Sequence, residues 1–241
     1  FWSSRYAAPM ESSKPLPPVP GRGAPTNLRP TRTGSLDREA DGDWLDAAGD
    51  IDGEAPRLRT TVTVEHPKTI IARNSSPDVG FDRSINPYRG CEHGCIYCFA
   101  RPTHAFHDLS PGLDFESRLF AKPDAAKLLR AELAKRNYKV APLAIGTNTD
   151  GYQPIEREWG ITRSVVEVLA ETRHPLIITT KSDRVLRDID LLADMARDNL
   201  VGVAVSVTTL DPAIARTLEP RAPHPRRRLA AIRKLIDAGV P

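Results

Sequence analysis

All three cysteines of the chain, Cys91, Cys95 and Cys98, lie within the stretch GCEHGCIYCFARP at the spacing C-x3-C-x2-C. Thiolates are soft ligands that bind zinc and hold iron–sulfur clusters. A 4Fe–4S cluster normally has four cysteine ligands, whereas this chain has three cysteines in all. The spacing therefore predicts a cluster in which one iron lacks a cysteine ligand and is open to a substrate or cofactor, like the vacant position of a catalytic metal site.

A structural zinc site is the alternative interpretation of the same cysteines. His93, His104 or His107 would then supply the fourth ligand. Zinc sites usually show paired ligands separated by a longer loop, so we favour the iron–sulfur cluster. His104 and His107 are also candidates for an acid, a base or a substrate contact, although a histidine in a loop or helix more often has a structural role.

Composition bounds the class of protein. With 241 residues, of which 40% are hydrophobic, the chain is long enough to bury a sizeable core. The net charge of +3 is too small to indicate nucleic-acid binding by itself. No apolar run approaches the roughly 20 residues that span a bilayer, and no secretion signal is present, so no membrane association is expected. Three clustered thiols make a poor disulfide framework, which favours a reducing, cytoplasmic location.

The chain is predicted to divide near residue 60. Residues 1–60 contain eight of the 22 prolines and a strongly acidic stretch, without a sustained apolar period. This composition predicts a disordered, proline-rich and acidic tail. Residues 61–241 are the predicted folded core, which begins with a strand-like segment over 61–74. The chain ends in DAGVP, where Gly239 is typical of a helix end, so we expect the fold to be truncated at its C-terminus.

Strands and helices are predicted to alternate from Asp124 onward. Apolar spacing predicts helices over 123–137, 162–173, 184–199 and 225–239, and short apolar strands over 142–148, 175–181 and 201–209. Strands without polar alternation are expected to be buried on both faces, which indicates a parallel β/α array. We expect an α/β fold, either a full or partial (β/α) barrel or a doubly wound sheet.

In either fold the ligand site lies at the carboxyl ends of the strands. This rule brings together the cysteine segment, the loop Thr147–Asp150 and the segment after Thr180. Asp150 is a candidate site carboxylate, although an aspartate after a strand is also an ordinary turn residue. Thr162 is expected to cap its helix. The basic run Arg226–Arg228 is expected to form the solvated face of the last helix rather than a phosphate contact.

The cysteine motif resembles that of the radical S-adenosylmethionine (radical SAM) superfamily, C-x3-C-x-(aromatic)-C, with Tyr97 as the aromatic residue. The likeness extends from NSSPDVGFDRSINPYRG to the C-terminus. It is similar in particular to the bacterial subgroup related to spore photoproduct lyase, often described as DNA repair photolyase-like. The phrases that carry this similarity are SINPYRGCEHGCIYCFARPTH, SPGLDFESRLFAK, TNTDGYQPIER and TTLDPAIARTLEPRAP, and GRGAPTN resembles the N-terminal segment of these proteins. The resemblance implies a partial (β/α) barrel of the radical SAM type.

The resemblance also implies a reaction. S-adenosylmethionine would chelate the open iron of a 4Fe–4S cluster, and one electron from the reduced cluster would cleave it to a 5′-deoxyadenosyl radical. That radical would abstract a hydrogen atom from a substrate, in an enzyme of lyase or DNA-repair type. An electron donor such as ferredoxin or flavodoxin is the implied partner, and nucleic acid stays open as a further one.

Ligand roles follow from the resemblance residue by residue. Cys91, Cys95 and Cys98 are the implied cluster ligands. The implied cofactor-binding residues are Tyr97, Thr147, Asn148, Lys181 and Ser206. Two features depart from the family pattern. The loop at Thr147 lacks the glutamate of the usual Gly-Gly-Glu, and the chain has no separate cysteine of the kind that photoproduct lyases use as hydrogen donor, with Phe99 rather than tyrosine after the third cysteine.

Two other functions stay open beside the radical enzyme. One is a zinc-stapled nucleic-acid binding module, which predicts stoichiometric zinc and salt-dependent binding to DNA or RNA. The other is a non-catalytic iron–sulfur sensor or electron carrier, which predicts a redox-active cluster that is indifferent to S-adenosylmethionine. Metal analysis and titration with S-adenosylmethionine discriminate these hypotheses.

Overall fold

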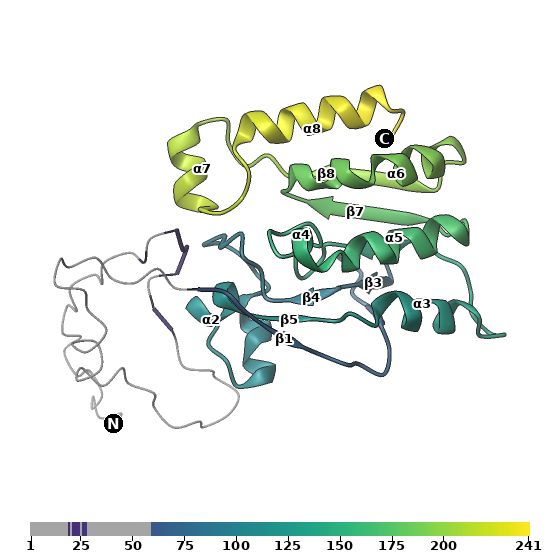
Figure 1. Cartoon of the computed structure of the whole chain (residues 1–241), viewed down its shortest axis with the longest axis horizontal. Helices are drawn as coiled ribbons and strands as arrows, with labels where there is room; N and C mark the ends of the chain where they lie inside the picture. The colour runs from purple at the N-terminus through teal and green to yellow at the C-terminus, as the bar shows by residue number, and fades with distance from the viewer. Residues whose placement is uncertain (1–18, 20, 25, 28–58) are drawn as a thin grey trace, which may run out of the picture.

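The computed structural model of the chain describes residues 19, 21–24, 26–27 and 59–241, which form two β-sheets and the helices that pack on them (Figure 1). Most of the predicted tail, residues 1–60, lies outside the described residues, so its disorder and the boundary at residue 60 stay predictions. Within the described part, no helix has the length and apolar character needed to cross a membrane.

The larger sheet is mixed and has five strands in the order β2-β3-β6-β7-β8. Its strands are β2 (Ile71–Arg73), β3 (Arg83–Ile85), β6 (Leu143–Ile145), β7 (Leu176–Thr180) and β8 (Val201–Val205). The last four are parallel to one another, and β2 pairs with β3 in the antiparallel sense at one edge. At the other edge the Val203 amide donates to the Pro241 carbonyl, 2.8 Å away, so the last residue lies beside β8.

A smaller sheet of three strands, in the order β1-β5-β4, was not predicted from the sequence. It consists of β1 (Thr61–Val64), β5 (Arg118–Ala121) and β4 (Tyr88–Arg89). The predicted strand over 61–74 is divided between the sheets, because β1 pairs with β5 whereas β2 pairs with β3. Pro67 lies between them, and proline cannot donate a hydrogen bond to a sheet.

The predicted helices are present, with shorter bounds. They are α3 (Ala125–Leu133), α5 (Ile161–Glu171), α6 (Ile189–Arg197) and α8 (Pro225–Asp237). Further helical segments are η1 (Arg101–His107), α2 (Leu113–Ser117), α4 (Glu156–Trp159), η2 (Asp183–Asp188) and α7 (Pro212–Leu218). Helix α3 packs on α5, α5 packs on α6, and α8 packs on η2, so the helices form a continuous layer beside the sheet (Figure 1).

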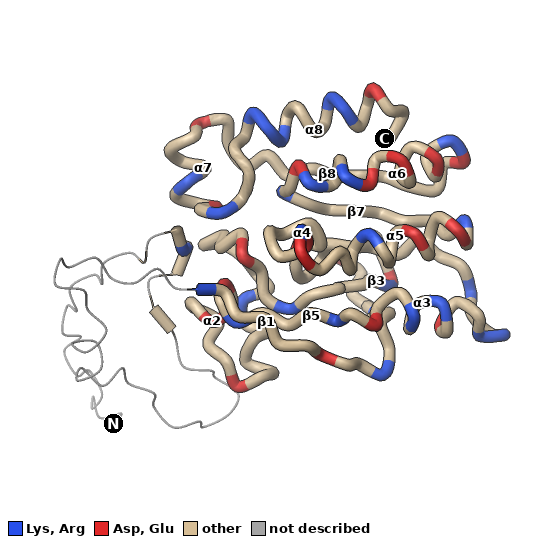
Figure 2. Tube along the Cα trace, viewed as in Figure 1, with Lys and Arg blue, Asp and Glu red and all other residues tan. Residues whose placement is uncertain are grey.

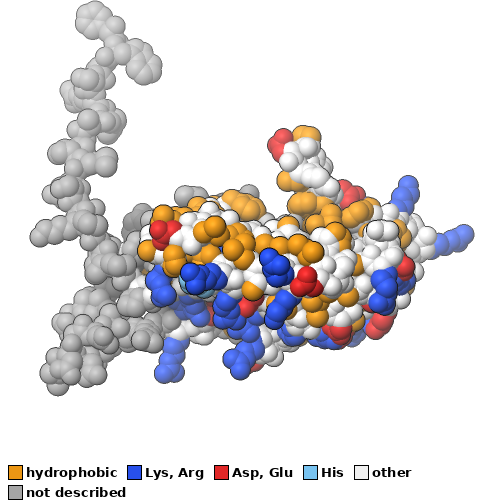
Figure 3. All heavy atoms as spheres, turned by 90° about the horizontal axis from the view of Figure 1, so that it is seen from above, with side chains coloured by type: hydrophobic (Ala, Val, Ile, Leu, Met, Phe, Trp, Pro, Cys, Tyr) orange, Lys and Arg blue, Asp and Glu red, His pale blue; other side chains and the backbone are white. Residues whose placement is uncertain are grey.

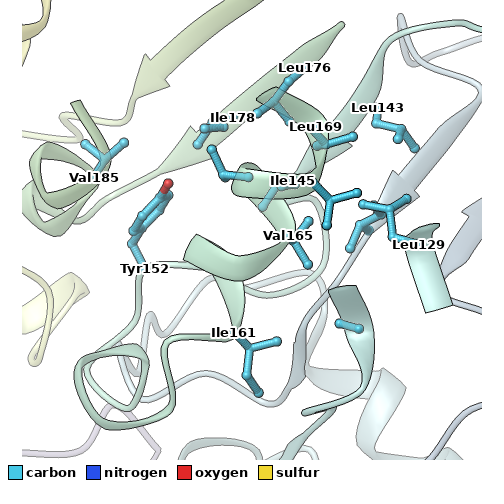
Figure 4. Close-up of a cluster of buried hydrophobic side chains, with 14 of the residues drawn as sticks. Leu129, Leu143, Ile145, Tyr152, Ile161, Val165, Leu169, Leu176, Ile178 and Val185 are labelled. Atoms are coloured by element: carbon cyan, nitrogen blue, oxygen red, sulfur yellow. The ribbon is translucent and has the colours of Figure 1, made fainter. Parts of the chain in front are cut away.

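The core lies between this helical layer and one face of the larger sheet. Figure 4 shows it as a cluster of mostly aliphatic side chains from β6, β7, α3 and α5, together with Tyr152 and with Val185 of η2. Leu143, Ile145 and Ile178 of the strands and Leu129 and Leu169 of the helices are completely buried there. This packing supports the predicted α/β class.

The expectation that the strands are buried on both faces is wrong for β7 and β8. Along β7, burial alternates: Leu176, Ile178 and Thr180 are buried, whereas Thr179 is exposed and Ile177 is 40% exposed. On β8, Ala204 lies beside Thr179 and is also exposed. The helices cover one face of this part of the sheet, so its other face is open among the described residues. Closure of the sheet into a barrel stays a prediction.

Thr162 does not cap α5 with its side chain, contrary to expectation. Its hydroxyl donates to the Gly151 carbonyl at 2.5 Å, and its amide donates to Glu156 Oε2 at 2.9 Å. Glu156 Oε1 also accepts from the Arg163 amide at 3.3 Å. The buried Glu156 carboxylate thus satisfies the free amides of the first turn of α5, where a negative charge is favoured.

Candidate functional site

A pocket at the carboxyl ends of β6, β7 and β8 gathers most of the residues that the sequence singled out. Its lining combines the cysteine segment with the loops that follow these strands. The predicted ligands that line it are Cys91, Cys95, Cys98, Thr147, Asn148, Lys181 and Ser206. Tyr97 is the one predicted ligand outside the lining, and its ring lies 5.7 Å from Lys181 Nζ. The placement agrees with the rule for parallel sheets, while the ligand roles stay predictions.

Gly146 lets β6 and β7 come close at the floor of the pocket. It has φ +89, a conformation that favours glycine. A Cβ atom at this position would lie 1.9 Å from the Thr179 carbonyl oxygen. A side chain here would therefore force the loop Thr147–Asp150 away from the end of β7.

The three thiols differ in exposure. Cys91 and Cys95 are each 8% exposed, whereas Cys98 is half-buried. Burial raises the pKa of Cys91, and it raises that of Cys95 to about 12. Burial thus favours the protonated, unreactive thiol at Cys91 and Cys95, and a metal that coordinates these thiols deprotonates them.

Asp150 joins the cysteine segment to the end of β7. Its Oδ1 accepts from the Tyr152 amide at 2.9 Å and from the Thr180 hydroxyl at 2.7 Å. Its Oδ2 accepts from the Lys181 amide at 2.7 Å and lies 3.3 Å from His93 Nδ1. Burial alone would raise the pKa of Asp150, but the interaction with the His93 ring and the hydrogen bonds from Lys181 and Thr180 hold it below its ordinary value. Asp150 is thus both a turn residue and an ionised carboxylate of the site.

Lys181 carries the positive charge of the pocket. Burial alone would lower its pKa, but interactions with the neighbouring Cys95, Tyr97 and Glu219 side chains raise the pKa above its ordinary value. Its ammonium lies 3.9 Å from Glu219 Oε1. The side chain is therefore a fixed cation at the pocket wall, suited to a carboxylate or phosphate.

Glu219 is a site residue that sequence reasoning missed. It is 2% exposed and accepts hydrogen bonds from the Tyr97 hydroxyl and, at 2.6 Å, from the Thr208 hydroxyl. Burial alone would raise the pKa of Glu219, but these hydrogen bonds and Arg228 lower it. Glu219 thus positions both Tyr97 and Lys181. The only signal in the sequence was its place in the phrase TTLDPAIARTLEPRAP.

Arg228 corrects the interpretation of the basic run. Basic residues recur along α8 (Figure 2), and the space-filling view from this side of the molecule shows blue Lys and Arg side chains on its surface (Figure 3). Arg226 and Arg227 are exposed as expected. Arg228, by contrast, is 1% exposed and forms an ion pair with Glu219 at 2.5 Å. Its guanidinium also donates to the Ser206 carbonyl at 3.1 Å. Arg228 therefore holds in place Glu219 and the backbone of the pocket residue Ser206.

Of the three candidate zinc ligands, His93 lines the same pocket as the thiols, whereas His104 and His107 do not. His104 packs edge-on against Phe115 and donates through Nε2–H to the Arg118 carbonyl, 2.9 Å away. His107 stacks on Phe120 with ring centroids 4.3 Å apart. Across the described ranges, no group of three His, Cys, Asp or Glu side chains is arranged to hold one ion in common.

The residues fit a 4Fe–4S cluster better than a single ion. The thiolates of a cubane bind different irons, so they need not converge on one point. Three thiols that line one pocket, with a lysine ammonium near Cys95, form a donor set suited to a cluster with an additional ligand.

The sequence of the chain matches a known protein family. A family model described as the Radical SAM superfamily matches residues 85–241. The chain belongs to the radical SAM superfamily. In this superfamily a 4Fe–4S cluster and S-adenosylmethionine are implied, and the three cysteines of the motif lie within the matched residues.

Curated relatives of this superfamily member include proteins from bacteria and archaea. An uncharacterized protein of Mycobacterium bovis is 41% identical over 160 residues, which cover 66% of this chain and 47% of that protein. An uncharacterized protein of Methanocaldococcus jannaschii is 27% identical over 156 residues, covering 65% of this chain and 56% of that protein. The chain thus spans about half the length of the curated relatives that it matches.

Solved structures of spore photoproduct lyase share the fold of this radical SAM domain. The complex with dinucleoside spore photoproduct has a TM-score of 0.54 at 18% identity, over 74% of this chain and 48% of that chain. A double variant with bound AdoMet and dinucleoside spore photoproduct has a TM-score of 0.55 at 19% identity, over 80% of this chain and 54% of that chain. At these identities the likeness shows the fold alone.

Proposed function

We propose that the chain acts as a radical SAM enzyme whose Cys91, Cys95 and Cys98 thiolates hold a 4Fe–4S cluster. One observation carries the proposal: in a chain of this superfamily, the three thiols, Lys181 and the loops after β6, β7 and β8 line the same pocket. When bound and reduced, the cluster supplies the electron that cleaves S-adenosylmethionine to a 5′-deoxyadenosyl radical, which abstracts hydrogen from the substrate.

The residues of the chain bind and orient the cofactor in this proposal. The Lys181 ammonium pairs with the carboxylate of S-adenosylmethionine, because a charge-assisted hydrogen bond is strong at a partly buried site. The Thr147 hydroxyl, the Asn148 amide and the Ser206 hydroxyl offer donors and acceptors to its other polar groups. Glu219 keeps the Lys181 side chain at the pocket wall, 3.9 Å from its own carboxylate.

The finer parts of the proposal concern the whole fold and its partners. The parallel strands β3, β6, β7 and β8 form part of a (β/α) barrel, and a ferredoxin or flavodoxin supplies electrons. A lyase reaction on a nucleic acid is supported by similarity of fold alone. All three cysteines of the chain are in the cluster motif, so such a reaction needs a hydrogen donor other than a cysteine of these residues.

Anaerobic reconstitution with iron and sulfide tests the proposal. The chain should bind about four irons and four sulfides, show charge-transfer absorption in the visible range, and release 5′-deoxyadenosine from S-adenosylmethionine under reductant. Lys181→Ala should weaken binding of S-adenosylmethionine about 10–100-fold, since a hydrogen bond to a charged group contributes about 1.5–3 kcal/mol. The matched control is Lys127→Ala on the exposed side of α3, which should bind as the wild type does.

Other outcomes would favour the competing functions. Stoichiometric zinc without iron after anaerobic purification would contradict the radical enzyme and favour the nucleic-acid binding module. A cluster whose electron paramagnetic resonance spectrum does not change with S-adenosylmethionine would favour the sensor or carrier.

A further inference from the structure

A short N-terminal segment lies against the cysteine segment, although the two are far apart in the sequence. We call its residues Arg22, Gly23, Ala24, Thr26 and Asn27 the strap, and residues 91–98 the cysteine loop. Figure 1 draws the strap in purple, beside the end of the domain that carries α2. The Gly23 amide and its acceptor Glu116 are separated by 93 positions in the sequence.

The strap is anchored on one buried carboxylate. Glu116 of α2 is completely buried. Its Oε2 accepts from the Gly23 amide and its Oε1 from the Ala24 amide, each at 2.9 Å. In addition, Arg22 donates to the Glu116 carbonyl at 2.6 Å. A buried carboxylate is costly unless it is paired and hydrogen-bonded. The Gly23 and Ala24 amides therefore stabilise the buried charge of Glu116.

Arg101 connects the Glu116 carboxylate to the cysteine loop. Arg101 forms an ion pair with Glu116 Oε1 at 2.5 Å. It also donates to the Cys95 carbonyl through both Nε and Nη2, at 3.0 and 2.9 Å. The backbone of the second cysteine is therefore oriented by an arginine whose counter-ion is held by the strap.

The strap also touches the cysteine loop directly. A Cβ atom on Gly23 would lie 1.8 Å from the Gly94 carbonyl oxygen and 3.2 Å from the Ile96 side chain. Gly94 has φ +66, and a Cβ atom there would lie 2.7 Å from Glu116 Oε2. Strap, cysteine loop and α2 thus meet at a point where neither glycine has room for a side chain.

A second set of contacts secures the other side of the loop. Arg22 donates to the Thr60 hydroxyl at 3.1 Å, and that hydroxyl donates to Glu92 Oε1 at 2.7 Å. Glu92 Oε1 also accepts from Arg221 at 3.0 Å. The residue after Cys91 is therefore connected to the strap and to the segment after α7.

The remaining strap residues bind the start of α2. Asn27 Oδ1 accepts from the Asp114 amide at 2.9 Å, and its Nδ2 donates to Asp114 Oδ1 at 3.1 Å. The Thr26 carbonyl accepts from the Leu113 amide at 3.2 Å. These contacts fix the helix that carries Glu116.

We propose that the strap positions the cysteine loop for ligation and determines how firmly the loop retains iron. Arg22, Gly23 and Ala24 are positioning residues, since they act through Glu116 and Arg101 on the Cys95 backbone and make no ligand bond themselves. Groups that orient metal ligands from outside typically change metal affinity by about 10–100-fold when they are removed. The inference rests on the proposed function in one respect, namely that the loop binds a cluster.

The test compares glycine-to-alanine variants of the whole chain. Gly23→Ala pushes a methyl group into the Gly94 carbonyl, whereas Gly80→Ala is the matched control because no atom lies within 4 Å of its Cβ position. After reconstitution, iron release to a chelator should be about tenfold faster for Gly23→Ala than for the wild type, and unchanged for Gly80→Ala. The spectrum of the reduced cluster should also change in Gly23→Ala.

A core variant separates positioning from general destabilisation. Leu129→Ala removes a buried side chain of α3 and should lower the thermal midpoint without accelerating iron release. Iron release that is the same in Gly23→Ala and the wild type, or that follows the thermal midpoint across all variants, would overturn the proposal.

Hydrogen exchange of the wild-type chain keeps the proposal testable if Gly23→Ala does not fold. Peptides that cover the strap and the cysteine loop should be protected together in the iron-free protein, and both should gain protection when the cluster is loaded. Exchange of the strap at the rate of a free peptide in both forms would overturn the proposal. If the wild type binds no iron, the proposed function fails, while joint protection in the iron-free protein still decides whether the strap holds the loop.

Discussion

The loops after β6 and β7 differ from the cysteine loop in how their geometry is fixed. The former continue directly from strands that are joined by an unbroken parallel ladder, in which Ile145 pairs with Ile178 and Ile178 with Val203. The cysteine loop contains no helix or strand. Side chains from other segments hold it instead: Gln153 bonds the Glu92 amide and the Gly90 carbonyl, at 2.9 and 3.1 Å.

This difference separates two kinds of sensitivity. A ladder distributes its stability over many backbone hydrogen bonds, so a single substitution in a strand-end loop changes a local contact. The cysteine loop depends on a few buried polar side chains, each of which is costly to leave unpaired. Substitutions outside the loop, at Glu116 or Gln153, should therefore disturb it more than substitutions of strand-end residues disturb their own loops.

The largest expected effect comes from removing a ligand. Cys95→Ala should abolish cluster loading, because a cubane held by two thiolates lacks the third anchor that the motif supplies. Thr147→Ala, in a strand-end loop that lines the same pocket, should load iron like the wild type. Iron and sulfide analysis measures the loading of both variants. A Cys95→Ala protein with full iron content would contradict the assignment of Cys95 as a cluster ligand.

A smaller but still large effect is expected for the buried ion pair beside the cysteine loop. Glu116 is completely buried and Arg101 is 12% exposed. Breaking such a pair by Glu116→Ala should lower the free energy of unfolding by about 3–5 kcal/mol. Arg130–Glu171 is a matched ion pair on the surface, at the same 2.5 Å distance and more than half exposed on both sides. Denaturant titration should show no measurable change for Glu171→Ala.

A moderate effect is expected where the two regions meet. Asp150→Asn should cost about 1–3 kcal/mol, because an amide replaces one charged acceptor by a donor opposite the Lys181 amide. Since the pKa of Asp150 is held below its ordinary value of 3.8, its contribution is complete above that pH. It is lost as the pH falls through the pKa of the folded state. The stability difference between wild type and Asp150→Asn should therefore shrink in acid, and a difference independent of pH would argue against an ionised Asp150.

The smallest expected effect concerns a lysine beneath the strand-end loops. Burial lowers the pKa of Lys122 to about 8, and its ammonium donates to the Asn86 carbonyl at 2.8 Å. The folded state therefore binds fewer protons than the unfolded state above this pH, so stability rises with pH. The free energy of unfolding should gain about 1 kcal/mol between about pH 8 and pH 9. Lys122→Met should remove this gain, and equal slopes for the two proteins would contradict a lowered pKa.

The sequence predicted the regular half of the fold well. Helices α3, α6 and α8 and strands β6, β7 and β8 lie within their predicted ranges, and α5 begins one residue before its range, because each carries its own apolar period. Strands β3 (RSI), β4 (YR) and β5 (RLFA) were missed because each is short and contains an arginine, so none shows an uninterrupted apolar run. Burial of both faces of β7 was wrong because a run such as LIITT contains no sign of which face a helix covers.

Prediction of the site was likewise limited to residues that a local sequence pattern or the resemblance singles out. The resemblance selected Cys91, Lys181 and Ser206, and the rule for strand ends brought them to one pocket. Arg228 was assigned to solvent because its local pattern is that of a basic helix face. Its burial depends on Glu219, which lies outside any periodic element, and a pairing between a helix and a loop leaves no local signal.

The long reach of the contacts around the cysteine loop has a consequence for the order of folding. Glu92 is joined to Arg221 across 129 positions, Tyr97 to Glu219 across 122, and Gly23 to Glu116 across 93. Closing such large loops lowers the entropy of the chain before the contacts that stabilise the closed loop can form. We therefore expect the cysteine loop to reach its final geometry late, after synthesis has passed residue 221. A cluster would then be inserted after the rest of the domain has folded, because the thiols of a nascent chain are not yet held in place.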